Sequence, residues 1–475
     1  MPARKVGLPS DVPPALTEGL AAVRARLEIL EKFPSEVTRA AEQAASKARW
    51  PELDRTDLEL ITIDPPGARD LDQALHITRD GEDFCVSYAI ADVAAFVSPG
   101  DPVDVEAHRR GQTLYGPDHR TPLHPPALSE DAASLLSEQV RPALLWTVRL
   151  DHRGQTLEAQ VCRAKVRSRS QLTYQEAQAE IDGGSPRESL ALLKELGLWR
   201  EQRERDRGGV SLQIPEQEIN TDVPQWALTF RSPLPVEGWN AQVSLLTGMA
   251  AAHIMMYGQV GILRTLPPAD KGSLRRLRQT AKALHISWPA ELDYPEFVRS
   301  LNPERADHAA MLNACTTVFR GAGYRAFSGG IPVDAEHAAL AVEYAHATAP
   351  LRRLVDRYVG EICLALCADE PVPPWVLTAL DALPAEMARS EQRAKKFERA
   401  TFDLVEAFLL QGRVGETFIG TIVEVNEDKT SGSVVIASPA VEAKITGANL
   451  PLGQQAPVRL VCANPAEAVV RFELA

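Results

Sequence analysis

Three aspartates, Asp64, Asp70 and Asp72, lie within nine residues, between apolar runs at 58–63 and 74–77 that are typical of strands. Carboxylates this close repel one another unless a cation neutralises them, and such oxygen ligands suit Mg²⁺ or Mn²⁺. Paired divalent ions cleave phosphodiesters in many enzymes, so the stretch predicts a metal site. The alternative is a solvated acidic turn, since Asp, Pro and Gly are common turn residues. A calcium-binding loop does not fit, because position twelve from Asp70 is Gly81 rather than Glu.

Length and composition indicate a globular enzyme. The 475 residues are enough for two or three domains, and 45% hydrophobic with 24% charged residues is ordinary for a soluble protein. The net charge of −13 argues against a general polyanion binder, so a nucleic-acid partner would need positive charge concentrated in a groove. The N-terminus carries no apolar signal segment and no run of eighteen apolar residues occurs. We therefore expect a cytoplasmic monomer that makes no membrane contact.

The pattern along the chain predicts three parts. Residues 15–32 and 35–48 are rich in helix formers, which predicts a short N-terminal helical unit over 1–50, with a helix-turn-helix as one alternative. Short strand patterns begin near 57, and helical patterns return from about 187. A long polar helix over about 376–411 would connect a body at 51–411 to a β-barrel at 412–475.

The clearest helix pattern follows Pro350, with an apolar stripe running to Leu366. Thr348 precedes this proline as a helix cap would, which predicts Arg352 and Arg353 in the first turn. The helix dipole disfavours cations at that end. A local rule broken in this way favours a site that needs positive charge, for example for a ligand phosphate.

A row of cations alternates along the predicted strand near 163–169. Arg163, Lys165, Arg167 and Arg169 would share one face, with no acidic residue inside the run. Phosphates are the expected partner of such a row, and a solvated sheet face is the alternative. A second basic cluster near 271–278 is better explained as a solvated helix face.

Signatures for nucleophilic and nucleotide-dependent catalysis are absent. The chain has no Walker lysine loop, no G-x-S-x-G elbow, no H-E-x-x-H motif and no dinucleotide-binding glycine fingerprint. Metal-activated water therefore remains as the expected source of the attacking group.

Four ordered segments resemble the ribonuclease II (RNB) catalytic domain shared by ribonuclease II and ribonuclease R. They are the aspartate stretch 62–75, the strand-like run 88–97, the run 128–135 with Arg141, and the late block of Arg320 with 344–353. The resemblance covers about residues 50–370. It implies an α+β fold in which helices pack on a mixed sheet, followed by a C-terminal OB-fold barrel.

The resemblance also implies an activity and a set of site residues. Such enzymes degrade RNA processively from a free 3′ end to nucleoside 5′-monophosphates, with Mg²⁺ and with Mn²⁺ as a substitute. It implies Asp64, Asp70, Asp72 and Gln73 as metal ligands, and the aspartates with Arg320 and Arg352 as catalytic groups. The expected RNA contacts are Tyr115, Tyr174, Arg167, Arg169, Tyr344 and Arg353.

The sequence departs from the family pattern near the expected site. Gln73 stands where a fourth aspartate is usual, and Asn240, Ala241 and Gln242 occupy the region of a family glutamate. A catalytically impaired RNA-binding protein on the same fold is therefore an alternative. A phosphodiesterase for DNA or small nucleotides is a second one.

The ends of the chain also depart from the pattern. The N-terminus is too short for the two cold-shock domains that usually clamp RNA, so we expect a short form with a more open entrance that tolerates structured RNA. The C-terminal barrel carries 5 Lys/Arg against 7 Asp/Glu over 413–475, with Phe418 and Phe472 as its aromatic residues. A strong stacking platform is therefore not expected there.

Overall fold

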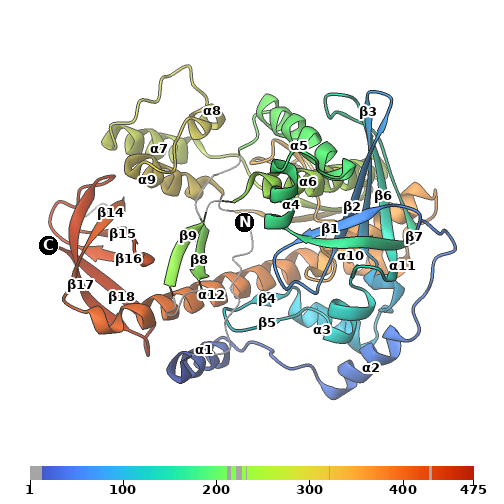
Figure 1. Ribbon diagram of the computed structural model, residues 1–475, viewed down its shortest axis with the longest axis horizontal. Coiled ribbons are helices and arrows are strands. Elements are labelled where there is room, and N and C mark those ends of the chain that lie inside the picture. The colour runs from blue at the N-terminus through green and yellow to red at the C-terminus, as the bar shows by residue number, and fades with distance from the viewer. Residues whose placement is uncertain (1–12, 211–215, 221–226, 232, 320, 427–429) are drawn as a thin grey trace.

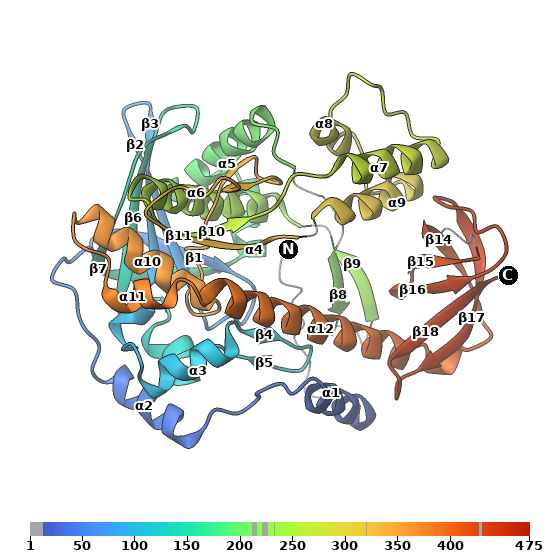
Figure 2. The same cartoon turned by 180° about the vertical axis from the view of Figure 1, so that it is seen from behind.

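The computed structural model describes residues 13–210, 216–220, 227–231, 233–319, 321–426 and 430–475. Two closed β-barrels lie at opposite ends of the molecule, and one long helix joins them, as Figure 1 and the reverse view in Figure 2 show. Helices and strands occur in separate groups around these barrels. The predicted α+β class is confirmed.

The first barrel has the strand order β1-β2-β3-β6-β7. Its strands are β1 (Leu60–Asp64), β2 (Gln73–Asp80), β3 (Asp83–Ala91), β6 (Val140–Leu150) and β7 (Thr156–Thr173). β1 pairs in parallel with β7, and the other neighbours are antiparallel. The expected mixed sheet thus closes on itself, and the parallel pair brings Asp64 beside Thr173 at one end of the barrel.

Helices cover this barrel and share its core. They are α4 (Tyr174–Asp182), α5 (Glu188–Asp206), α6 (Pro235–Tyr257) and α10 (Leu354–Cys367). Trp146 and Tyr88 of the barrel lie in one apolar cluster with Val243 of α6 and Tyr358 of α10. Burial of these large side chains holds the helices to the barrel.

A group of shorter elements lies between the two barrels. It contains α7 (Lys271–Ala283), α8 (Tyr294–Arg299), α9 (Ala306–Cys315), and the pair β8 (Glu216–Asn220) with β9 (Ala227–Arg231). The pair β10 (Val260–Thr265) with β11 (Gly323–Ser328) instead shares the core of the first barrel through Ile262, Leu263 and Phe327. A further pair joins β12 (Glu336–His337) and β13 (Val342–Glu343). Phe297 and Met311 of the helices share a core with Val423 of the second barrel, so this group packs against that barrel.

The C-terminal part matches its prediction closely. After α11 (Pro374–Ala379), the long helix α12 (Leu383–Leu410) leads into the closed barrel β14-β15-β16-β18-β17. Its strands are β14 (Thr417–Val425), β15 (Ser431–Ala437), β16 (Ala440–Thr446), β17 (Gln455–Asn464) and β18 (Val469–Leu474). The predicted C-terminal β-barrel is confirmed.

The N-terminal helices do not pack as one unit. α1 (Pro14–Arg26) buries Leu16 and Leu20 in a cluster with Phe397 of α12, whereas α2 (Ser35–Ala45) buries Val37 in a different cluster beneath the first barrel. Figures 1 and 2 both show the two helices apart. The alternative of a helix-turn-helix is therefore wrong, because each apolar face is used by a different neighbour.

The helix expected from Pro350 begins four residues later, at Leu354. The prediction that Thr348 caps it, and that Arg352 and Arg353 lie in its first turn, is wrong. Arg353 is the residue just before the helix, and residues 348–353 form a loop. Long-range hydrogen bonds, described below, hold this loop and outweigh its local helix signal.

Candidate active site

Asp72 is a buried carboxylate held by the loop that precedes α10. Its side chain is 3% exposed. Its Oδ1 accepts a hydrogen bond from the Leu351 N–H at 2.8 Å, and its Oδ2 accepts one from the Arg352 Nε at 3.0 Å. Burial raises the pKa of Asp72 to about 7, although the Arg352 guanidinium and the Leu351 N–H both act to lower it.

Further bonds fix the same loop on both sides of Arg352. The Ala349 N–H donates to the buried Asp356 Oδ1 at 2.7 Å. The Arg352 carbonyl accepts from the Thr113 N–H at 3.0 Å, and the Leu354 N–H donates to the Gly111 carbonyl at 3.0 Å. The backbone thus places the Arg352 side chain at Asp72 independently of any ligand.

Asp70 is held by an arginine that sequence reasoning missed. Arg120 donates to Asp70 Oδ1 and also to Glu130 Oε1, with an Nη2–Oε1 distance of 2.9 Å in the second pair. Arg120 lies in β5 (Arg120–Thr121), opposite Tyr115 in β4 (Leu114–Tyr115). No local motif marks Arg120, because its role depends on contacts far away in the sequence.

Asp64 ends β1 beside the start of α4. Thr173 caps α4 in a capping box with Glu176, which fixes Tyr174 as the first residue of the helix. Burial, together with the Asp64 carboxylate, raises the pKa of the Tyr174 hydroxyl to about 12. The Asn240 side chain hydrogen-bonds to the same hydroxyl. Tyr174 and Asp64 therefore lie within electrostatic reach of each other.

The charges of all three aspartates act on Arg352, and Asp72 is in direct contact with it. Burial opposes the charge on Arg352, but Asp72, Tyr115 and the carboxylates of Asp64 and Asp70 outweigh it and raise the pKa of the guanidinium. The charges of Arg352, Asp70 and Asp72 also act on the Tyr115 hydroxyl. Burial raises the pKa of its hydroxyl, and Asp70 and Asp72 add to that rise.

The donor set fits a divalent cation in its chemistry. Carboxylate oxygens are the ligands that Mg²⁺ prefers. Within the described ranges, however, no group of three or more His, Cys, Asp or Glu side chains is already arranged as a metal site. Arg352 and Arg120 occupy oxygens of Asp72 and Asp70, so a metal bound here would compete with these two arginines.

Gln73 points into a set of protein hydrogen bonds. Its Nε2 donates to the Thr348 carbonyl at 2.6 Å, and its Oε1 accepts from the Tyr88 hydroxyl at 2.7 Å. Metal ligation by Gln73 stays a prediction, and its oxygen already has a partner.

Tyr344 and Arg353 lie close to the site but are engaged by the protein. Tyr344 is 7% exposed, with His346 edge-on at 5.5 Å between ring centroids. Arg353 donates from both Nε and Nη2 to Asp356, each at 2.9 Å. An RNA contact by either side chain stays a prediction.

The alternating cations of β7 share one face as predicted, since the three residues between them are buried. In space, however, the row is not free of carboxylates. Arg163 pairs with Asp92 at 2.8 Å and also with Glu361. Arg169 donates to the Thr56 carbonyl at 2.7 Å. The absence of acidic residues inside the run therefore did not predict the electrostatics of this face.

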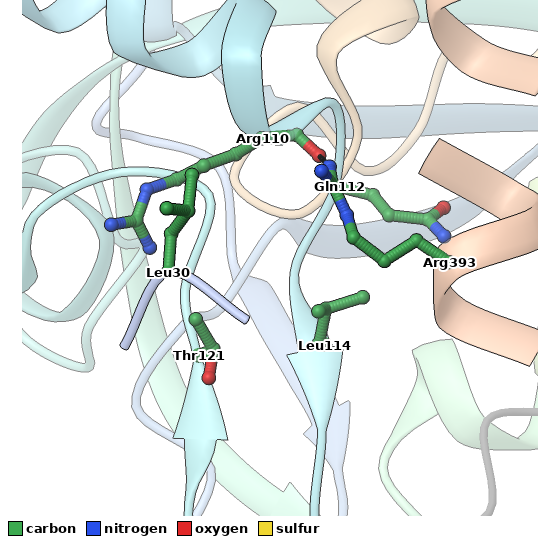
Figure 3. Close-up of a pocket in the computed structure, with 6 residues that line it drawn as sticks. All are labelled: Leu30, Arg110, Gln112, Leu114, Thr121 and Arg393. Carbon is green, nitrogen blue, oxygen red and sulfur yellow. Dashed lines mark hydrogen bonds between the residues drawn. The ribbon is translucent and has the colours of Figure 1, made fainter. Parts of the chain in front are cut away.

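One predicted site residue and one small crevice remain to be described. Arg320 lies outside the described residues. Beside the β4–β5 hairpin, a crevice of about 10 Å³ has room for about one water molecule and is too small for a substrate. Figure 3 shows its lining residues, Leu30, Arg110, Gln112, Leu114, Thr121 and Arg393.

Comparison with known proteins decides the family. The model of the RNB domain matches residues 53–368, which is more than half of the chain. The chain belongs to the RNB-domain exoribonuclease family. A second model, the C-terminal S1 domain of RNase II-type exonucleases, matches residues 416–475. The S1 match assigns the second barrel. The domain boundaries at 51–411 and 412–475 stay a prediction, and the RNB match ends before α12 begins.

Curated relatives carry the same domain. Ribonuclease R of Aquifex aeolicus is 25% identical over 94% of this chain and 68% of its own length. The human exosome complex exonuclease RRP44 is 26% identical over 74% of this chain. The chain spans 37% of the length of that relative.

Solved structures share the fold. Mycoplasma genitalium RNase R in complex with ribose-methylated single-stranded RNA has a TM-score of 0.85 at 18% identity, over 97% of this chain and 78% of that one. Yeast Ssd1, described as a pseudonuclease, has a TM-score of 0.71 at 15% identity, over 96% of this chain and 58% of that one. The fold alone therefore occurs with and without nuclease activity. Across the described part of the chain, no helix is both long and apolar enough to cross a membrane.

Proposed function

We propose that this RNB-domain protein hydrolyses RNA from a free 3′ end and releases nucleoside 5′-monophosphates in a reaction that requires Mg²⁺, with Mn²⁺ as a substitute. The observation that carries the proposal is the pair of buried Asp72 with the partly exposed Arg352, whose guanidinium is also stabilised by the charges of Asp64 and Asp70. Family membership supports the reaction type. The retained carboxylates and arginine support catalytic competence.

The aspartates would hold the metal. Asp64, Asp70 and Asp72 supply carboxylate oxygens, and a bound Mg²⁺ would activate water and offset charge at the scissile phosphodiester. Arg120 orients Asp70 through its own bridge to Glu130.

Arg352 would act on the reacting phosphate itself. A guanidinium beside the metal ligands can stabilise the charge that grows on the non-bridging oxygens. The loop bonds at Thr113 and Gly111 hold it in place before substrate arrives, which lowers the cost of positioning it during the reaction.

Aromatic and basic groups would bind the RNA strand. Tyr115 and Tyr174 lie close to the aspartates, and an aromatic face binds any base without reading sequence. Arg167 and Arg169 of β7, with Arg320, Tyr344 and Arg353, are the further proposed contacts.

One experiment separates the main possibilities. 5′-Labelled RNA and DNA are incubated with Mg²⁺, Mn²⁺ or EDTA, using the wild type, Asp72→Asn and Asp64→Asn. Metal-dependent shortening of RNA alone, lost in both variants while circular dichroism shows an intact fold, supports the proposal. Cleavage of DNA at a similar rate would favour a broader phosphodiesterase.

A catalytically impaired RNA-binding protein is the second candidate. Three observations favour it. Gln73 is bound by protein groups, Asn240 occupies the region of a family glutamate, and the described residues hold no ready-made metal cluster. RNA that stays intact and tightly bound with every metal would establish this candidate and overturn hydrolysis.

Tolerance of structured RNA belongs to the same proposal. A relative of the same fold, Mycoplasma genitalium RNase R, has been solved in complex with double-stranded RNA. For this chain we expect digestion of a hairpin with a 3′ overhang to continue into the duplex. An enzyme that stalls many nucleotides before the duplex would contradict this expectation.

A further inference from the structure

The side-chain amide of Gln73 belongs to a closed ring of hydrogen bonds. Gln73 Nε2 donates to the Thr348 carbonyl at 2.6 Å, and Gln73 Oε1 accepts from the Tyr88 hydroxyl at 2.7 Å. Tyr88 in turn hydrogen-bonds to the Ser244 side chain. Ser244 Oγ lies 2.8 Å from Thr348 Oγ1, which completes the ring.

The ring joins three parts of the site that are far apart in the sequence. Tyr88 comes from β3 of the first barrel, Ser244 from α6, and Thr348 from the loop before α10. Tyr88 is 1% exposed and Thr348 is 2% exposed, so a broken ring would leave buried polar groups without partners. Such a network is strongest when each member is satisfied.

Asp72 and Gln73 hold the same loop at two points. Asp72 binds the Leu351 N–H and the Arg352 guanidinium, and Gln73 binds the Thr348 carbonyl three residues earlier. The bond at Thr348 therefore limits how far Arg352 can move from Asp72. Both attachments come from consecutive residues at the start of β2.

The ring requires an amide at position 73. An amide donates and accepts at the same time, whereas an ionised carboxylate only accepts. A carboxylate at this position could not donate to the Thr348 carbonyl. A cation on Gln73 Oε1 would also compete with the buried Tyr88 hydroxyl for that oxygen.

We propose that Gln73 is a positioning residue, which fixes the Thr348–Arg352 loop against Asp72, and that it is not the fourth metal ligand. The proposal rests on the proposed function, because positioning matters for catalysis only if Arg352 and Asp72 act on RNA. It gives a physical reason for the departure from the family pattern. Position 73 carries an amide in place of the usual aspartate because the loop needs a donor to the Thr348 carbonyl.

The test compares Gln73→Met with Tyr88→Phe. Gln73→Met removes both hydrogen bonds at similar side-chain volume, and Tyr88→Phe removes the hydroxyl partner of Gln73 without touching any expected metal ligand. Gln279→Met, on the exposed face of α7, is the matched control. A third variant, Gln73→Glu, restores the family charge but cannot donate to Thr348.

Three readouts are measured on each variant. Hydrogen–deuterium exchange of peptides spanning 344–353 reports on the loop in metal-free protein. Electron paramagnetic resonance gives the Mn²⁺ dissociation constant, and single-turnover RNA cleavage gives the rate. Only the third readout depends on the proposed function.

We expect Gln73→Met and Tyr88→Phe to behave alike. Both should speed exchange of the loop and slow cleavage by about tenfold, which corresponds to about 1.4 kcal/mol of transition-state stabilisation. Mn²⁺ affinity should stay within about twofold of the wild type, as in Gln279→Met. Gln73→Glu should also be slow.

The opposite pattern overturns the proposal. If Gln73→Met weakens Mn²⁺ binding while Tyr88→Phe behaves as wild type, or if Gln73→Glu tightens binding and speeds cleavage, Gln73 is a metal ligand. If no protein cleaves RNA, the proposed function fails, while loop exchange and Mn²⁺ affinity still decide the role of Gln73.

Discussion

Arg352 and Arg353 are adjacent residues with different surroundings. Arg352 bonds to Asp72 and is stabilised by the charges of Asp64 and Asp70. Nε and Nη2 of Arg353 instead bind Asp356, whose side chain is fully buried. Charge at position 352 is thus available to a substrate. Charge at position 353 compensates the buried Asp356 carboxylate at the start of α10, and the proposed RNA contact would use the remaining N–H groups of this guanidinium.

Substituting each arginine by methionine separates these roles. Arg352→Met should lower kcat by about 10²- to 10³-fold, because one preorganised donor to the reacting phosphate is lost. Arg353→Met should instead lower the free energy of unfolding by about 3 kcal/mol, because Asp356 stays buried without its partner. Urea unfolding and steady-state kinetics measure the two effects. An Arg353→Met variant as stable as wild type would contradict the structural role.

Asp72 also predicts a pH dependence of metal binding. Burial raises its pKa to about 7, so the metal-free protein holds a proton on this carboxylate below that pH, and a bound metal displaces it. The apparent Mn²⁺ affinity should therefore fall by about tenfold for each pH unit below 7 and level off above it. Calorimetry in buffers of different ionisation enthalpy counts the released proton. Affinity that does not change between about pH 5 and pH 7 would contradict this competition between the proton and the metal at Asp72.

At the scale of elements, α1 is tied to the hairpin that carries Tyr115 and Arg120. Arg24 of α1 is 2% exposed and donates to Asp118 in the turn between β4 and β5. Its Nη2 also lies 3.2 Å from His119 Nδ1. The N-terminal helix therefore supports one wall of the site, although it contributes no residue to the chemistry.

Breaking this tie should affect substrate binding more than turnover. Arg24→Met removes a buried charge-assisted hydrogen bond worth about 2 kcal/mol, and it loosens the hairpin that presents Tyr115. We expect a lower melting temperature and a KM for RNA that rises more than kcat falls. The control is Arg26→Met, which changes an exposed arginine on the same helix. Equal melting temperatures for the two variants would show that the Arg24 contact is not stabilising.

Local patterns predicted most elements, and long-range bonds explain the main failure. The apolar stripe after Pro350 correctly indicated a helix, yet its start moved to Leu354 because Asp72, Thr113 and Gly111 hold the preceding loop. Capping signals describe competition within a few residues. They do not include partners that lie more than two hundred residues away in the chain.

The same limit applies to the site. The spacing of Asp64, Asp70 and Asp72 predicts a cation-binding cluster, and metal binding there stays a prediction. Arg120 and Glu130 carry no motif, and their importance follows only from where the β4–β5 hairpin folds. For the β7 row the sequence suggests too much free positive charge. The run itself contains no acidic residue, but in the folded protein Arg163 pairs with Asp92 and Glu361.

At the scale of the whole molecule, the net charge of −13 does not favour general attraction of RNA. RNA binding should then depend on a few cations near the strand. Arg163 is already neutralised by two carboxylates, while Arg169 is bound to a backbone carbonyl and keeps its charge.

The salt dependence of RNA binding gives the number of contacts between these cations and RNA phosphates. Each phosphate contact to single-stranded RNA contributes about −0.7 to the slope of log K against log salt. Arg167→Met and Arg169→Met should each make the slope shallower by about that amount. Arg163→Met should leave the slope unchanged. Fluorescence anisotropy with Asp72→Asn as the background prevents cleavage during the titration, and a large change in slope for Arg163→Met would contradict the pairing.

The central claim is that the aspartates and Arg352 form a hydrolytic centre at which a 3′ end of RNA is cut. The most direct measurement is a single-turnover reaction of excess protein with RNA labelled in its 3′-terminal nucleotide, started with Mg²⁺. The account predicts that the label appears first as a nucleoside 5′-monophosphate, and that Asp72→Asn leaves it in the full-length strand. Label that stays in long RNA with the wild type, or that leaves as a 3′-phosphate or an oligonucleotide, would contradict it.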